Sequence, residues 1–205
     1  MDNKNLPNII PIFPLSGVIF FPKTNLPLNI FEPRYLSLVN DCIKSNKYMG
    51  MIQTKNNSSD VYSIGCLGKI TEHKTTDNGG LLINLTGIRR FEVESEIFSS
   101  KKYREFKVTY KKFSNELQRR DGSTDELFNK TKIFFKKNGL LLNWNEFDKL
   151  DQDEKVNTLA MIAPISNEEK QTILECVDIY SKIKLLSEII EFYLYEKSTD
   201  SITLQ

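Results

Sequence analysis

The residues that could carry out chemistry in this chain are few. His73 is the only histidine, and the three cysteines, Cys42, Cys66 and Cys176, are widely spaced and form no C-x-x-C pair. A nucleophilic serine or cysteine needs a base within reach, and His73 is the only imidazole that could serve. A zinc site needs several cysteine or histidine ligands at short spacing. We therefore expect neither covalent catalysis nor a metal centre, and we assign the cysteines to structural positions.

The sequence also lacks the common nucleotide-binding motifs. Neither G-x-x-x-x-G-K-[ST] nor G-x-G-x-x-G occurs, so no phosphate-binding loop is predicted. Composition alone leaves a Ser–Lys dyad open, but no G-x-S-x-G context supports one. We predict a protein that is not an enzyme and holds no cofactor.

The elements that must position any site fall into two parts. Before about residue 115, Pro33–Asn46 has helical apolar spacing, and the other regular segments are short apolar or alternating runs, as expected for strands. With a single helix available for crossovers, the strands should be mainly antiparallel and rolled to protect their edges. The predicted strands are Ile9–Phe13, Leu26–Ile30, Tyr48–Gln53, Ile64–His73, Gly80–Thr86, Arg89–Ile97 and Tyr103–Phe113.

After residue 115 the apolar period changes to that of helices. Four pairs of residues have the spacing of a capping box, namely Ser123/Glu126, Asn143/Glu146, Asp151/Glu154 and Ser166/Glu169. A last helix is predicted over Asp178–Glu196. The fold class is therefore α+β, with a β domain over residues 1–115 and a helical bundle over residues 116–205.

Charge is unevenly distributed although the whole chain carries only +1. Residues 101–137 carry +7 and residues 138–205 carry −7. Either the basic segment binds RNA or another acidic partner, or the oppositely charged segments complement each other within the fold. Only 6 of the 28 basic residues are arginine, the residue that phosphate recognition favours, so we prefer the second interpretation.

No segment reaches the length of about 18 apolar residues that a membrane helix needs, and the apolar run Ile9–Phe21 is interrupted by prolines and by Ser16-Gly17. We expect a soluble, cytoplasmic protein without a membrane partner.

A specific constellation of motifs lies in the first part of the chain. It comprises Ile12-Phe13-Pro14-Leu15, Val18-Ile19-Phe20-Phe21-Pro22, Leu26 to Tyr35 (LPLNIFEPRY), Ile64 to Ile70 (IGCLGKI) and Gly87-Ile88-Arg89-Arg90-Phe91. Together these resemble the N-terminal, substrate-binding domain of Lon proteases. The EPRY form is similar to that of stand-alone bacterial proteins without the ATPase and peptidase modules. Two residues depart from the common pattern: Asn29 replaces a frequent histidine, and Lys23 follows Phe-Pro where glycine is usual.

The resemblance implies a rolled β domain related to PUA-like barrels, followed by a helical bundle, and an activity of recognising unfolded or damaged polypeptide without cleaving it. It thus points to an adaptor or quality-control factor, with a protease or a chaperone as a further partner. PUA-like ancestry keeps RNA binding through residues 101–137 as the alternative function.

Two predictions concern individual residues of this framework. Unfolded polypeptide offers apolar side chains and unpaired backbone, so a binder needs an exposed apolar patch or an open strand edge. The candidate surface is an aromatic and apolar cluster that could instead fill the barrel; its members are Phe20, Phe21, Leu26, Phe31 and Tyr35. We also expect Glu32 to pair with Arg89 or Arg90 and so to join the start of the helix to the strands.

Overall fold

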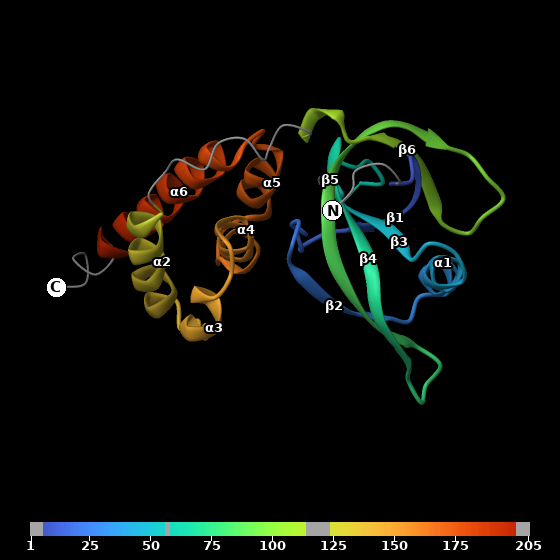
Figure 1. Cartoon of the computed structure of the whole chain (residues 1–205), viewed down its shortest axis with the longest axis horizontal. Helices are drawn as coiled ribbons and strands as arrows, with labels where there is room; N and C mark the ends of the chain where they lie inside the picture. The colour runs from blue at the N-terminus through green and yellow to red at the C-terminus, as the bar shows by residue number, and fades with distance from the viewer. Residues whose placement is uncertain (1–5, 56–57, 114–123, 200–205) are drawn as a thin grey trace. The chain divides into compact units, whose positions relative to one another are not determined.

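Strands of very unequal length form the first part of the structure, a computed structural model that describes residues 6–55, 58–113 and 124–199 (Figure 1). The strands are β1 Ile9–Leu15, β2 Asn25–Ile30, β3 Tyr48–Gln53, β4 Ile64–Thr75, β5 Leu81–Ile97 and β6 Arg104–Thr109. Helix α1 spans Pro33–Lys44, and a short 3₁₀ turn, η2, spans Lys111–Phe113. The chain divides into two compact units, residues 1–114 and 115–205. Their independence as domains stays a prediction.

The sheet closes on itself because β5 is long enough to pair with three other strands. The order is β2-β5-β4-β3-β1-β6, and the last half of β5 also pairs with β6. Five strands therefore form a closed barrel, while β2 is attached only to the first half of β5. All pairs are antiparallel except β1 with β3, for which β2 and α1 provide the crossover. The prediction of a mainly antiparallel, rolled sheet is confirmed.

One prediction about the strands is wrong. Gly80–Thr86 and Arg89–Ile97 are a single strand, β5, and not two. The sequence suggests a break because of Gly87. In the structure, the backbone of Gly87 packs so closely on the carbonyl of Phe21 that a Cβ atom would collide with it. The glycine therefore serves a close approach, and the shift in pairing at Leu67/Gly68 keeps β5 continuous.

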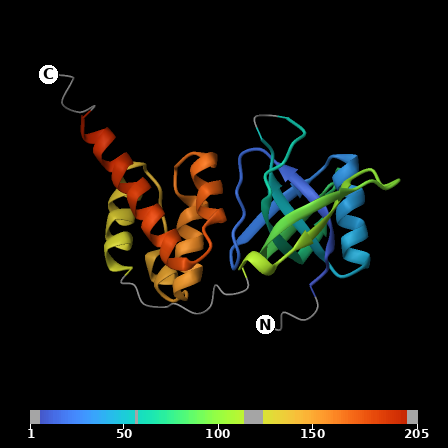
Figure 2. The same cartoon turned by 90° about the horizontal axis from the view of Figure 1, so that it is seen from above.

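The barrel interior is filled by apolar residues from every strand that closes it. One core cluster contains Ile10, Ile12, Ile52, Leu67, Phe91, Phe106 and Val108. Gly65 leaves room for the ring of Phe91, because an added Cβ would lie 2.5 Å from that ring. Helix α1 packs on β1 and β3 through a buried stripe that includes Tyr35, Leu38 and Cys42. Figures 1 and 2 show α1 on one side of the barrel, end-on in the first view and lengthwise in the second.

The second unit contains five described helices, α2 Asp125–Lys137, α3 Trp144–Asp148, α4 Gln152–Ile162, α5 Asn167–Glu175 and α6 Ile179–Thr199. The side chains of Asn143, Asp151 and Ser166 cap α3, α4 and α5 as predicted, and the last two form full capping boxes. Ser123, predicted to cap the first helix, lies outside the described residues. Helix α6 packs against α2, α4 and α5. The predicted helical segment is therefore confirmed.

Candidate functional site

The predicted apolar surface is mostly core. Phe20, Phe21, Leu26 and Tyr35 are 2%, 0%, 8% and 6% exposed, whereas Phe31 is 68% exposed. The barrel and α1 together bury four of these five side chains, which the sequence alone does not indicate. As examples, Leu26 faces Leu85 across the β2–β5 ladder, and the ring of Tyr35 lies 4.1 Å from that of Phe13. Of the five residues, the structure therefore presents only Phe31 to solvent.

The predicted ion pair is replaced by a shorter-range one. Glu32 accepts from the guanidinium of Arg34, with the Nη2–Oε2 distance at 2.9 Å. Arg89 donates to the carbonyl of Phe113 at 3.3 Å, and the fully buried guanidinium of Arg90 lies 3.8 Å from the centroid of the Phe113 ring. The prediction that Glu32 pairs with Arg89 or Arg90 is thus wrong. These arginines instead hold η2 against β5, a role that the sequence spacing does not indicate.

Strand β2 has an open edge among the described strands. It pairs with β5 on one side, and Figure 1 shows no strand beyond it on the other. The amide of Gly87 donates to the carbonyl of Thr24, and this orientation recurs at every second residue of an antiparallel ladder. The backbone groups of Leu26, Leu28 and Ile30 therefore face β5. Those of Asn25, Pro27 and Asn29 face outward.

Pro27 lies at an outward-facing position of β2, where its missing N–H breaks no hydrogen bond to β5. Because Pro27 has no N–H, the open edge offers donors at Asn25 and Asn29 only, and carbonyl acceptors at all three residues. The side chain of Asn25 accepts from Thr86 at 2.7 Å, which fixes that end of β2 on β5. The edge strand has six residues and contains a proline, two features that limit non-specific pairing with other strands.

Two exposed apolar side chains lie at the other end of this strand. Phe31 follows β2 directly, and Leu82, which is 46% exposed, faces Asn29 across the ladder. Outward-facing backbone groups and exposed apolar side chains therefore occur together at the C-terminal end of β2. We call the outward backbone of Asn25, Pro27 and Asn29, together with Phe31 and Leu82, the β2 edge site.

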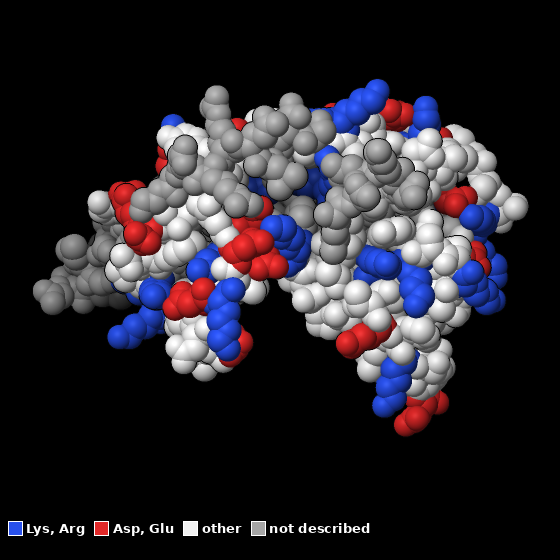
Figure 3. Space-filling model, viewed as in Figure 1, with Lys and Arg blue, Asp and Glu red and all other residues white. Residues whose placement is uncertain are grey.

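The basic strand β6 is neutralised by glutamates of β5. Arg104 binds Glu96 at 2.7 Å and Lys107 binds Glu94 at 3.0 Å. The Arg104 hydrogen bond lowers the pKa of Glu96 below its ordinary value. On the face shown in Figure 3, basic and acidic side chains are interspersed over the first unit. The charges of Arg104 and Lys107 are therefore met within their own sheet, whereas Lys130 of α2, also in the 101–137 segment, pairs with Glu191 of the acidic C-terminal segment at 2.9 Å.

Two of the three cysteines lie in the core of the first unit. Cys42 and Cys66 are buried, and burial raises the pKa of the Cys42 thiol to about 12. A thiol with such a pKa stays protonated at neutral pH and is a poor nucleophile. His73 is exposed on β4, opposite Ile83. Among the described residues no group of three or more His, Cys, Asp or Glu could hold a metal ion.

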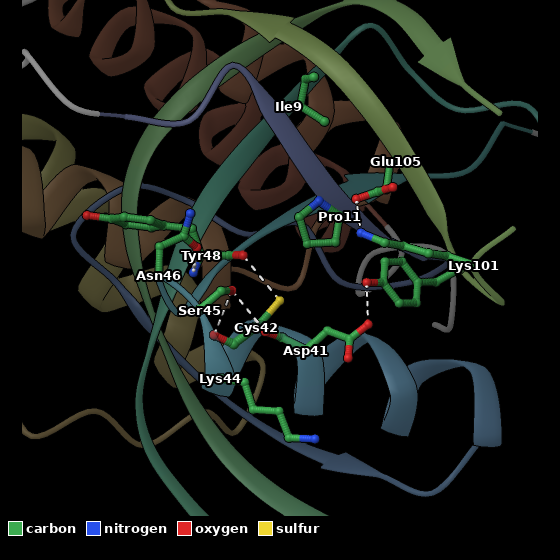
Figure 4. A pocket seen from close by; sticks show the side chains of 11 residues that line it. Ile9, Pro11, Asp41, Cys42, Lys44, Ser45, Asn46, Tyr48, Lys101 and Glu105 are labelled. Atoms are coloured by element: carbon green, nitrogen blue, oxygen red, sulfur yellow. Dashed lines mark hydrogen bonds and ion pairs between the residues drawn. The ribbon is translucent and has the colours of Figure 1, made fainter. Parts of the chain in front are cut away.

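A pocket of about 350 Å³ that the sequence did not indicate lies between α1, β1 and the segment before β6 (Figure 4). Tyr103 donates to a carboxylate oxygen of Asp41 at 2.7 Å, and Lys101 donates to Glu105 at 2.7 Å. Burial, followed by the hydrogen bond to Asp41, raises the pKa of Tyr103 to about 12. The hydrogen bond to Glu105 raises the pKa of Lys101. The pocket therefore keeps a neutral phenol and a charged ammonium at pH 7.

No helix in the described part of the chain combines the length and the apolar composition needed to cross a membrane.

Comparison with known proteins places this arrangement among Lon-related sequences. The family model of the ATP-dependent protease La (LON) substrate-binding domain matches residues 9–191. Lon protease from Cytophaga hutchinsonii is 26% identical over 103 residues, which cover 47% of this chain and 13% of that protein. Lon protease from Desulfosudis oleivorans is 25% identical over 203 residues, which cover 92% of this chain and 24% of that protein. The chain thus spans about a quarter or less of the length of these relatives.

Solved structures share the fold. A Lon N-terminal domain protein from Xanthomonas campestris matches with a TM-score of 0.64 at 22% identity, covering 87% of this chain and 96% of that one. The N-terminal domain of Mycobacterium avium complex Lon protease matches with a TM-score of 0.61 at 16% identity, covering 89% and 98%. These likenesses confirm the predicted α+β fold of the Lon N-terminal type.

Proposed function

Because this chain belongs to the family of the ATP-dependent protease La (LON) substrate-binding domain, we propose that it binds unfolded polypeptide at the β2 edge site. The observation that carries the proposal is the coincidence of an open strand edge with the exposed ring of Phe31. An unfolded segment offers unpaired backbone and apolar side chains, and this site has a complement for each.

The backbone part of the site can accept one short strand. A segment laid along β2 can accept from the N–H groups of Asn25 and Asn29 and can donate to outward carbonyls, including that of Pro27. Such main-chain bonds are independent of the client's sequence. They suit a protein that recognises the unfolded state of many clients.

The side-chain part of the site supplies an apolar contact. Phe31 and Leu82 leave apolar surface in water that a client side chain can cover, at about 25 cal/mol per Å² of apolar surface removed from water. Because the edge has few hydrogen-bonding groups, this contact should decide whether a bound segment stays. A cytoplasmic protein of this kind would serve as an adaptor or quality-control factor that passes clients to a protease or a chaperone.

The proposal is tested by capture of a client that cannot refold, such as a reduced and carboxymethylated protein, on the immobilised full chain. Phe31→Asp is expected to reduce capture at least tenfold, because a carboxylate replaces the apolar contact. Phe98→Asp is the matched control, since Phe98 is 93% exposed and directly follows the last residue of β5, whereas β2 pairs with the first half of that strand. Equal capture by the two variants would refute the β2 edge site.

The RNA alternative is separated from polypeptide binding by its salt dependence. Affinity for RNA falls steeply between 50 and 200 mM salt, because bound phosphates release counterions. Apolar capture of polypeptide should persist over this range. The glutamates of β5 pair with Arg104 and Lys107 of β6 and so reduce the positive charge available to phosphate groups. This favours polypeptide binding over RNA binding.

A further inference from the structure

We propose that two copies of this chain associate through the exposed face of α6, with the two helices antiparallel across a twofold axis. The inference does not depend on polypeptide binding at β2. It rests on a row of exposed side chains along α6 that complements its own reversed copy in both charge and apolar character.

The row runs along one side of α6 at steps of four residues, which place side chains next to one another on a helix. Its members are Tyr180, Lys184, Glu188 and Phe192. Tyr180 and Phe192 are 58% and 56% exposed. The side chains of Lys184 and Glu188 are 66% and 60% exposed. The row therefore has an aromatic residue at each end and one charge of each sign between them.

Apolar surface continues past both ends of this row. Val177, just before α6, is 53% exposed, and Tyr195, in the last part of the helix, is 68% exposed. The opposite side of α6 is apolar as well, because Leu186 and Ile190 are fully buried. A helix at the surface of a domain normally turns its polar residues to water. An exposed apolar face of this kind marks an interaction surface.

Two copies of the row complement each other when they run in opposite directions. In a twofold interface, a residue i of one copy contacts a residue j of the other, and j contacts i. With the axis level with Leu186, Lys184 of each copy faces Glu188 of the other. Tyr180 of each copy then faces Phe192 of the other. The interface thus gains two ion pairs and two aromatic pairs, whereas a parallel arrangement would place like charges together.

The charged residues of this face differ in how available they are to a second copy. Glu191, next to Phe192 in the sequence, already binds Lys130 of α2 at 2.9 Å. In contrast, Lys184 and Glu188 lie 4.0 Å apart within the helix, at the outer limit for an ion pair. These two residues can therefore exchange a weak internal pair for a pair across the interface.

The test is sedimentation velocity of the full chain from about 1 to about 500 µM, a range that resolves the weak association expected of a face formed by few residues. We expect the sedimentation coefficient to rise with concentration toward that of a dimer. Lys184→Glu and Glu188→Lys should each weaken association about tenfold, because each places like charges together twice. Lys149→Glu is the matched control, because Lys149 is similarly exposed, pairs with Glu146 and lies outside α6.

The pairing itself is tested by mixing the two charge variants. Lys184→Glu has two acidic residues at these positions and Glu188→Lys has two basic ones, so an equimolar mixture should associate more strongly than either variant alone. A parent chain that stays monomeric over the whole concentration range would overturn the inference. So would a mixture that associates no better than its components at unchanged melting temperatures. If Phe192→Asp lowers the capture of unfolded client and leaves association unchanged, the face binds polypeptide and the proposed dimer is wrong.

Discussion

The hydroxyl of Tyr103 donates a hydrogen bond of 2.7 Å to the carboxylate of Asp41, a residue 62 positions earlier in the chain. The bond joins the segment that precedes β6 to the last turn of α1. It therefore fixes one wall of the pocket and helps to hold α1 on the barrel.

Ionisation of Tyr103 should weaken the fold at high pH. Its pKa is raised from 10.0 to about 12 in the folded protein, first by burial and then by the bond to Asp41. The folded state therefore retains the proton more strongly than the unfolded state, and the stabilisation is complete below pH 10 and lost as pH rises toward 12. In urea unfolding at pH 8 to 11, Tyr103→Phe should show a smaller alkaline loss of stability than the parent chain. It should be less stable by about 1 kcal/mol at pH 8. Parallel pH curves for the two proteins would contradict this role.

Phe21 and Phe31 should respond in opposite ways to truncation. Phe21 is fully buried, so Phe21→Ala should lower the free energy of unfolding by about 3–5 kcal/mol through lost burial and the resulting cavity. Phe31 is 68% exposed, so Phe31→Ala should change it by less than about 0.5 kcal/mol. Chemical denaturation measures both. A stable Phe21→Ala variant would return this residue to the candidate binding surface.

The ion pair between Glu96 of β5 and Arg104 of β6 should stabilise the fold at neutral pH and lose that contribution in acid. Arg104 lowers the pKa of Glu96 below 4.5, so the folded state holds the carboxylate charged at a lower pH than the unfolded state does. This contribution is present above the unfolded pKa and is lost as pH falls through the folded one. Because both side chains are partly exposed, it should amount to less than about 1 kcal/mol.

Denaturation curves between pH 6 and 3 measure this effect. The loss of stability on acidification should be smaller for Glu96→Gln than for the parent chain. Glu146→Gln is the control, because its pair with Lys149 lies in the helical unit. An identical acid loss in Glu96→Gln and the parent would assign no stabilising role to the Glu96–Arg104 pair.

Local signals in the sequence predicted much of the fold correctly. The proline at the start of α1 and the capping residues of α3, α4 and α5 act over three or four residues, and the structure has them where the spacing placed them. Likewise, the positive φ of Gly79 lies in the predicted turn between β4 and β5.

Features that depend on closure of the sheet were harder to predict. An aromatic residue in a proline-rich segment can be core or surface, and closure of the barrel by β5 decides this for Phe20 and Phe21. Similarly, Asp41 and Tyr103 meet only because β6 pairs with both β1 and β5 and thereby brings its leading segment to α1. No local pattern reports such a contact.

The most direct test of polypeptide binding at β2 compares Asn29→Pro with Asn29→Ala in client capture. The backbone of Asn29 faces away from β5, so proline removes an outward N–H while leaving the β2–β5 bonds in place, whereas alanine keeps that N–H. We expect Asn29→Ala to capture unfolded client like the parent chain and Asn29→Pro to capture it at least fivefold more weakly, at a similar melting temperature. Equal capture by the two variants would contradict strand addition at this edge.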